Sequence, residues 1–188
     1  IVGHPDPGGN RFCHALAQTY SEGAEAAGHQ VKSIDIAQID FPVLRSKEDF
    51  DRGPVPEAIQ PAQETIRWAD HLVFFYPLWL GTMPAYFKAF MEQTFRPGFA
   101  AGKSGAGKPW SKLLIGKSAR VVITMGMPAF VYRWFYLAHS LKSLERNILG
   151  FCGIGPTKET LIGMVDTLED HERRKWLLKM RQLGEAGM

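Results

Sequence analysis

The 188-residue sequence lacks the features that define several large protein classes. No apolar run approaches the roughly 18 residues of a membrane-spanning helix, and no basic stretch followed by apolar and small residues opens the chain. The net charge is only +3, and no block of five or more like charges occurs. These absences argue against stable membrane insertion and against a nucleic-acid partner, and they make the cytoplasm the default location.

Cysteine and the common catalytic motifs are equally scarce. The two cysteines, Cys13 and Cys152, lack the CxxC spacing of a metal or thioredoxin-like site, and a disulfide framework would need more of them. Two free thiols in a reducing compartment are therefore expected. The chain also contains no GxSxG, no HExxH and no obvious carboxylate pair, so neither a hydrolytic triad nor a metal-dependent hydrolase is indicated.

What the chain does contain is enough apolar material for one core. Its residues are 45% hydrophobic and include 12 Phe, 5 Trp and 5 Tyr. No repeat or linker divides it, so residues 1–188 are expected to form a single domain. Because Ile1-Val2-Gly3 is short for a buried strand, we also expect the native polypeptide to have a few more residues upstream.

Hydrophobic periodicity predicts strands and helices that alternate along the whole chain. Apolar runs or alternation predict strands at 1–3, 31–36, 72–76, 119–125 and about 150–155, the last continuing brokenly to 162. Helical spacing predicts helices at 11–27, 56–69, from 83 onward, 129–149 and 168–183. This order predicts an α/β fold, a doubly wound five-stranded parallel sheet with helices on both faces. Ligands of such sheets bind beyond the carboxyl ends of the strands, which here means the loops after strands one, three and four.

The first loop, residues 3–10, leads into a helix N-terminus, where free amides bind anions. It lacks GxGxxG, so a bound phosphate and a plain turn both remain open. Asn10 and Arg11 are the plausible polar contacts, and His4 either orients the loop or touches the ligand. A second glycine-rich stretch, Gly102 to Lys108, satisfies GxxxxGK, but Pro109 follows it where a phosphate-binding loop needs Ser or Thr, which favours a surface loop.

The other two loops offer apolar side chains and bare backbone. Residues 76–84, after the third strand, suit a flat heteroaromatic ring, with ordinary core packing as the equal alternative. Residues 124–128, after the fourth strand, include Gly126, which lets backbone approach a ligand closely.

Four ordered motifs together resemble the flavodoxin-like NAD(P)H:quinone oxidoreductase family over almost the whole chain. They are Gly3-His4-Pro5-Asp6-Pro7, Tyr76-Pro77-Leu78-Trp79 through Met83-Pro84-Ala85 and Lys88, Phe95 to Ala100, and Asn147 to Ile154.

The resemblance implies which residues hold a flavin. The first loop would bind its phosphate, the loop after the third strand its isoalloxazine ring, and the loop after the fourth strand the pyrimidine edge of that ring. In that order, the residues are His4, Asn10, Arg11, Phe12 and Cys13; Pro77, Leu78, Trp79 and Leu80; and Thr124, Met125, Gly126 and Met127. The first loop departs from the family pattern, because it carries two extra residues and has Cys13 where an asparagine is common.

The resemblance also implies catalytic residues and the walls of a substrate slot. Relatives balance charge on the reduced flavin with a tyrosine and a histidine; Tyr132 lies at the matching distance, whereas His139 is one residue off and is alternatively an ordinary helix histidine. Tyr132, Trp134, Phe99 and Trp79 are the expected slot walls, with core packing as the alternative for Trp134.

The implied activity is a ping-pong reaction: NADPH or NADH gives a hydride to the flavin, and a quinone or similar electron-poor ring then takes two electrons in the same slot. FAD is favoured over FMN because the chain is longer than a minimal flavodoxin, with the adenine pocket drawn from 38–55 or 166–175. The family also implies a homodimer, joined through Phe99-Ala100 and the helix that starts at Phe130.

Four alternative functions remain. They are a nitro- or azo-compound reductase, a one-electron carrier, a redox-sensing subunit of a membrane transporter, and an inactive binding module. The net charge of +3 argues against the one-electron carrier, which should be strongly acidic.

Overall fold

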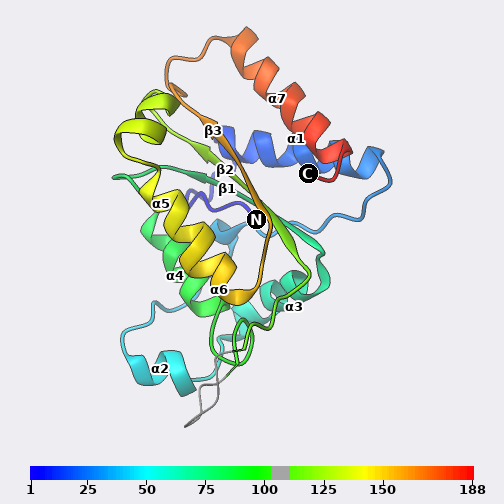
Figure 1. The fold of residues 1–188 in the computed structure, drawn as a ribbon. Helices are drawn as coiled ribbons and strands as arrows, with labels where there is room; N and C mark the ends of the chain where they lie inside the picture. The colour runs from blue at the N-terminus through cyan, green and yellow to red at the C-terminus, as the bar shows by residue number, and fades with distance from the viewer. Residues whose placement is uncertain (103–110) are drawn as a thin grey trace.

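A parallel β-sheet forms the centre of the computed structural model, which describes residues 1–102 and 111–188 (Figure 1). Its strands lie in the order β1 (His71–Pro77), β2 (Ser118–Thr124) and β3 (Thr157–Ile162). All but a few residues of β1 and β2 are buried, as expected for strands covered by helices on both faces. The predicted α/β fold with a parallel sheet is therefore present.

The first two of the five predicted strands reduce to single bridges. Val2 pairs in parallel with Phe75 of β1 on one side and with Asp35 on the other. The Val2 N–H donates to the Ile34 carbonyl at 2.8 Å, and the Ile36 N–H donates to the Val2 carbonyl at 3.2 Å. The predicted strand 31–36 is joined to Val2 only by the bridge at Asp35, so no continuous ladder of strand hydrogen bonds forms there. Among the residues that the structure describes, the sheet thus has three strands, and five strands are not confirmed.

The two faces of the sheet pack against different helices (Figure 1). One face contacts α1 (Phe12–Ala26) and α7 (Asp170–Glu185), and the other contacts α3 (Gln60–Trp68) and α4 (Ala85–Thr94). Alternation along the strands divides the side chains: Phe75 and Val122 point to the first face, whereas Phe74 and Val121 point to the second. The core therefore consists of two layers separated by the sheet.

Helices α1 and α7 lie side by side and approach each other through glycines (Figure 1). A Cβ atom on Gly184 of α7 would lie 2.1 Å from the Tyr20 carbonyl oxygen of α1. A Cβ atom on Gly23 of α1 would lie 2.2 Å from the Arg181 carbonyl oxygen of α7. Both distances are shorter than any real contact, so this helix packing requires glycine at both positions.

The prediction of one continuous helix at 129–149 is wrong. The segment divides into η3 (Val131–Phe135), α5 (His139–Lys142), η4 (Ser143–Leu149) and α6 (Gly150–Cys152), of which η3 and η4 have wide π-helical turns. The interruption falls at Leu137 and Ala138, whose φ angles are 53° and 48°. Residues in this left-handed region cannot continue a right-handed helix.

The strand predicted at about 150–155 with a broken continuation to 162 is confirmed in its continuation, which coincides with β3, but its first part is wrong, because the helical segment continues to Cys152. Gly153, with φ 99°, ends it, and β3 begins only at Thr157. The other predicted helices correspond to α1, to η2 (Glu57–Ile59) with α3, to α4 and to α7, with boundaries shifted by one to three residues.

The long segment 38–55 is ordered against α4. It includes α2 (Lys47–Arg52) and follows η1 (Ile36–Gln38). Three side chains hold it by donating to its carbonyl groups: Tyr86 to Ile39, Gln93 to Pro42, and Arg96 to both Gly53 and Pro54. The segment therefore packs on the side of the sheet that carries α4.

Two further observations concern residues 1–102 and 111–188. No helix in them is long and apolar enough to cross a membrane, and no group of three or more His, Cys, Asp or Glu side chains is placed to hold a metal ion. Most of the GxxxxGK stretch, from Lys103 to Lys108, lies outside the described residues.

Candidate functional site

A cavity of about 750 Å³ opens where α1 begins and where β1 and β2 end. It brings together all the predicted flavin-contacting residues except Leu80 and Met127. Its lining consists of His4, Asp6, Asn10, Arg11, Phe12, Cys13, Pro77, Leu78, Trp79, Thr124, Met125, Gly126, Val165, Asp166 and Arg173. The position at the carboxyl edge of the sheet is where ligands of doubly wound sheets bind.

The N-terminus of α1 supplies the anion-binding part of this cavity. Arg11 is the residue that precedes the helix, and within the described chain no side chain caps the first turn. That turn contains no acidic residue, so the amides of Phe12 and Cys13 have neither an intrahelical acceptor nor a competing carboxylate. The free amides and the helix dipole together favour a phosphate.

The loop before α1 is organised by Asp6. One of its carboxylate oxygens accepts from the Gly8 amide at 2.9 Å, and the other accepts from the Arg11 guanidinium at 2.6 Å. The Gly8 amide and the guanidinium of Arg11 lower the pKa of Asp6, so this carboxyl is ionised at neutral pH. The pair holds Arg11 at the cavity beside the free amides.

His4 lies buried under the same loop and presents one defined donor. The Asp6 amide donates to His4 Nδ1 at 3.1 Å, so the proton of the neutral ring is on Nε2. Burial and the nearby His14 lower the pKa of His4, which favours the neutral ring at pH 7. Its ring meets Trp79 edge to face, with 5.7 Å between the ring centroids.

Cys13 and Thr124 join α1 to the end of β2 at the floor of the cavity. The Cys13 Sγ and Thr124 Oγ1 atoms lie 3.1 Å apart in a buried hydrogen bond. Burial raises the pKa of the Cys13 thiol to about 11, so the group is a neutral thiol at pH 7 and is not activated as a nucleophile. Both cysteines are free.

Leu80 and Met127 lie beside the cavity and do not contribute to its described lining. Leu80 is at the tip of a tight turn closed by backbone hydrogen bonds between Trp79 and Thr82, where its φ is 46° and its side chain is fully exposed. Met127 is half-buried against the core, and its carbonyl accepts from the Met164 amide. Both flank the site, but neither forms its wall.

The structure places Tyr132 and His139 away from the cavity lining. Tyr132 is 1% exposed; its hydroxyl lies 2.7 Å from Ser140 Oγ and accepts from the Leu141 amide at 3.0 Å. His139 is exposed at the start of α5. The Tyr132 hydroxyl therefore has a structural role in joining η3 to α5.

Of the expected slot walls, only Trp79 contributes to the cavity. The prediction for Phe99 is wrong: it is buried, with its ring against that of Phe95 and the Arg67 guanidinium 5.1 Å from its ring centroid. Ala100 is fully buried as well, so Phe99-Ala100 cannot form a dimer surface. Trp134 is 73% exposed, which excludes core packing within the protomer.

We expect that removing the Tyr132 hydroxyl will affect folding more than chemistry. Tyr132→Phe leaves the Leu141 amide buried without an acceptor, which should lower the free energy of unfolding by about 1–3 kcal/mol, as measured by urea denaturation. Turnover, measured well below the melting temperature, should stay within about twofold of the wild type. A tenfold loss of kcat would instead support the charge-balancing role that the sequence predicts.

The residues that sequence reasoning missed come from the segment between β3 and α7 and from the first turn of α7. Val165, Asp166 and Arg173 lie before and within the first turns of α7, and Arg173 donates to the carbonyls of Val165 and Leu168. Its guanidinium also lies 5.4 Å from the ring centroid of Phe12. The only sequence signal was the proposed adenine-pocket segment 166–175, which contains two of the three residues.

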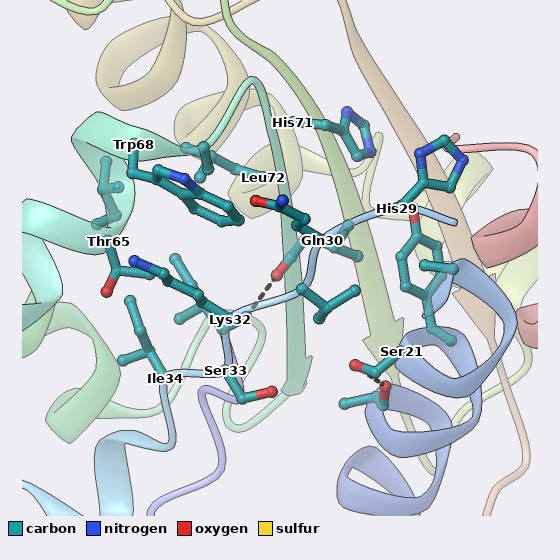
Figure 2. Close-up of a pocket in the computed structure, with 18 of the residues that line it drawn as sticks. Ser21, His29, Gln30, Lys32, Ser33, Ile34, Thr65, Trp68, His71 and Leu72 are labelled. Carbon is teal, nitrogen blue, oxygen red and sulfur yellow. Dashed lines mark hydrogen bonds between the residues drawn. The ribbon is translucent and has the colours of Figure 1, made fainter. Parts of the chain in front are cut away.

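A second hollow, of about 470 Å³, lies at the opposite edge of the sheet. Figure 2 shows its lining, in which Lys32 reaches toward Trp68, with Nζ 4.6 Å from the centroid of the indole ring, while Gln30 and His71 lie nearby. Because it lies at the amino ends of the strands, it is not where ligands of a doubly wound sheet bind. The cavity at the α1 N-terminus is the stronger candidate.

Comparison with known proteins agrees with this architecture. A curated NAD(P)H oxidoreductase of Haemophilus influenzae, described as uncharacterized, is 28% identical over 190 residues, which cover 99% of this chain and 93% of that protein. A solved NAD(P)H:quinone oxidoreductase from Methanothermobacter marburgensis superposes with a TM-score of 0.81 at 23% identity, over 98% of this chain and 94% of that one.

A more distant structure carries a ligand. It is an FMN-dependent NADH-azoreductase of Bacillus anthracis in complex with FMN, which superposes with a TM-score of 0.77 at 16% identity and covers 99% of this chain and 96% of that one. The family model described as a flavodoxin-like fold matches residues 1–183, nearly the whole chain. The protein belongs to the family of flavodoxin-like fold proteins.

Proposed function

We propose that this protein is a flavin-dependent NAD(P)H:quinone oxidoreductase. The observation that carries the proposal is the cavity at the carboxyl edge of the sheet, which joins an uncapped helix N-terminus to the loops after β1 and β2. The names of the relative from H. influenzae and of the neighbour from M. marburgensis support the same reaction class. The free thiols of both cysteines are consistent with the cytoplasm as its location.

The residues present fit a flavin with a phosphate tail. The amides at the start of α1 and the Arg11 guanidinium offer donors to the phosphate, and His4 offers Nε2–H. Pro77, Leu78 and Trp79 supply apolar surface for a flat ring, as flavin sites require. Leu80 and Met127 would then be outer contacts beside the ring. When bound, the flavin supplies hydride transfer, taken from NAD(P)H and passed on as two electrons to a quinone in a ping-pong order.

The protein's own residues bind and orient the cofactor. At pH 7, neutral His4 donates a hydrogen bond without adding charge, and Arg11 supplies the positive charge at the phosphate. Gly126 lets the backbone lie close to the Asp166 carboxylate, because a Cβ atom there would lie 2.8 Å from Asp166 Oδ2 and would displace that side chain. Tyr132 and His139 lie outside the cavity lining, so their predicted charge-balancing role is the alternative that the Tyr132→Phe variant tests.

We propose FAD as the cofactor, with FMN as the alternative. The cavity continues from the phosphate end to Val165, Asp166 and Arg173, which offer an apolar side chain, a carboxylate and a guanidinium to an adenosine. Arg173→Ala should weaken FAD binding about tenfold and leave FMN binding unchanged, because only FAD reaches that wall. Flavin fluorescence quenching measures both dissociation constants. Equal effects on the two flavins, or none, would favour FMN.

We also propose that the protein forms a homodimer. Phe130, Trp134, Phe135, Tyr136 and Leu137 are 48–77% exposed and adjacent in sequence, an apolar surface that monomers seldom leave open. An isologous contact through this segment would cover it in both copies. Light scattering at micromolar concentration should give twice the mass of one chain, and a monomer would refute the proposal.

The experiment that tests the function is steady-state oxidation of NADH and NADPH by the purified protein. With a quinone as acceptor, parallel double-reciprocal lines are expected from the ping-pong order. An azo dye in place of the quinone tests the second candidate, which the FMN-dependent azoreductase neighbour favours. Negligible turnover with every acceptor, despite bound flavin, would indicate the redox-sensing role, and a protein that binds no flavin would overturn the proposal.

A further inference from the structure

His14 is a half-buried titratable residue with two buried ring nitrogens, and the proposed function does not use it. It lies on α1, and among the residues that the structure describes neither of its ring nitrogens has a hydrogen-bond partner. A neutral histidine always carries one N–H, and leaving such a group buried and unpaired costs about 1–3 kcal/mol. His14 directly follows Cys13, which lines the cavity, so its unpaired ring nitrogens lie next to the site.

The surroundings of His14 connect it to the cavity through His4. The two rings are tilted by 48°, with 5.6 Å between their centroids. On its other side, His14 Nε2 lies 3.8 Å from Asp35 Oδ2, at the distance of an ion pair when the ring is protonated. Asp35, His14 and His4 thus form a row that leads from the edge of the sheet to the cavity.

The position and protonation of His4 matter because the ring lines the cavity. The Asp6 amide fixes the proton of the neutral ring on Nε2, as described above, and Trp79 packs against the ring from the other side. A neutral donor binds phosphate at constant strength, whereas a charged ring would make binding depend on pH. The groups that pack against His4 therefore determine how phosphate binding depends on pH.

We propose that His14, which lies between Asp35 and His4, is a positioning residue for the phosphate end of the flavin: it holds His4 in place and sets how that ring responds to pH. The proposal rests on the proposed function, since it assumes a phosphate in the cavity. Its effect on His4 is a property of the protein without cofactor and can be measured separately.

Charged groups face His4 from each element around it. His14 on α1 and Arg11 at the start of that helix lower the pKa of His4, in addition to burial, which is the largest cause; Asp6 and Asp35 raise it. Changes to His14 and to Asp35 should therefore move the titration of His4 in opposite directions, and a general loosening of the fold would not.

The test is an NMR titration of the His4 ring in the flavin-free protein. His14→Gln should raise the midpoint by about 0.5 pH unit, because the change removes a group that lowers the pKa of His4. Asp35→Asn should lower it, and it keeps an Oδ1 that can accept from the Ala37 amide as Asp35 does. His29→Gln, a change at an exposed histidine outside the cavity lining, is the matched control and should have no effect.

FMN binding across pH 5–8 provides the second measurement. Affinity should rise as the pH falls through the His4 midpoint, since a protonated ring attracts phosphate, and this rise should begin at higher pH in His14→Gln. An unchanged His4 midpoint in both variants, or shifts of the same sign, would overturn the inference. If the wild type binds no flavin while the midpoints still shift in opposite directions, the proposed function fails and the coupling of the two histidines stands.

Discussion

Gly184→Ala is expected to lower the free energy of unfolding by about 3 kcal/mol. In an ordinary helix the same change stabilises by about 0.5–1 kcal/mol, so the predicted sign is the reverse of the general rule. The cause is the Tyr20 carbonyl oxygen, 2.1 Å from where the new Cβ would lie. Backbone atoms cannot rotate away as a side chain can, so α7 must move off α1. Urea denaturation followed by circular dichroism measures the loss.

Gly23→Ala tests the same contact from the other helix. Its Cβ would lie 2.2 Å from the Arg181 carbonyl, so a similar loss is expected. In the double variant, one separation of α1 from α7 relieves both clashes, and the combined loss should be clearly less than the sum. Gln182→Ala, at an exposed position on α7, is the control and should change stability by less than about 0.5 kcal/mol. A neutral or stabilising Gly184→Ala would contradict the close packing.

The separation of these helices has a consequence for the site. Arg173 is on α7 and Phe12 is on α1, so the guanidinium that lies 5.4 Å from that ring depends on the helix packing. With FAD as the proposed cofactor, a shift of α7 should therefore weaken its binding along with stability. This links a glycine contact between two helices to one wall of the cavity.

Elements with a strong local signal were predictable from the sequence. The continuous apolar run from Leu72 to Tyr76 lies within β1, and Ala119 to Thr124 lies within β2, because buried parallel strands tolerate no polar alternation. The stripe from Phe12 to Ala27 gave α1, and Gly28 follows it with φ 87°, the conformation that ends helices. The loops at the ends of these strands then located the cavity.

Features that depend on long-range contacts were not predictable. The spacing of Phe130, Trp134 and Leu137 fits one helix, yet the chain turns at Leu137 and Ala138, where the Leu141 amide bonds to the Tyr132 hydroxyl. Such a contact does not change the hydrophobic periodicity from which helices are predicted. The segment 166–175 was named as a possible adenine pocket, but its contact with α1 at Phe12 was not predictable, since the sequence alone does not reveal that the start of α7 meets α1.

The polar residues of the first loop could be predicted from the sequence, but the ion pair that forms between two of them could not. Asn10 and Arg11 were recognised as polar contacts from their place before a helix. That Asp6 binds Arg11, and so brings a carboxylate to a site suited to an anion, follows only from the folded loop. In the folded loop, the positive charge of Arg11 offsets the negative charge of Asp6. The attraction of the site for an anion therefore depends on Arg11.

Arg11→Asp is expected to leave the fold intact and to reduce flavin affinity about a hundredfold. Arg11 precedes α1 with extended backbone, φ −93° and ψ 157°, the geometry from which an Asp side chain caps first-turn amides and adds about 1 kcal/mol of helix stability. The exposed ion pair with Asp6 that the change removes is worth at most about 1 kcal/mol. Folding is therefore nearly unaffected, whereas the phosphate loses a guanidinium and meets a carboxylate that occupies its amides.

Arg11→Asn separates the two causes of that loss. Asparagine caps the helix as well as aspartate does but brings no negative charge, so its flavin affinity should fall only about tenfold. Fluorescence titrations at low and high salt measure both variants, and the gap between them should narrow as salt screens the exposed charge. If Arg11→Asp binds flavin as tightly as the wild type while its unfolding free energy is unchanged, the phosphate does not lie at the N-terminus of α1, and the cavity must be used differently.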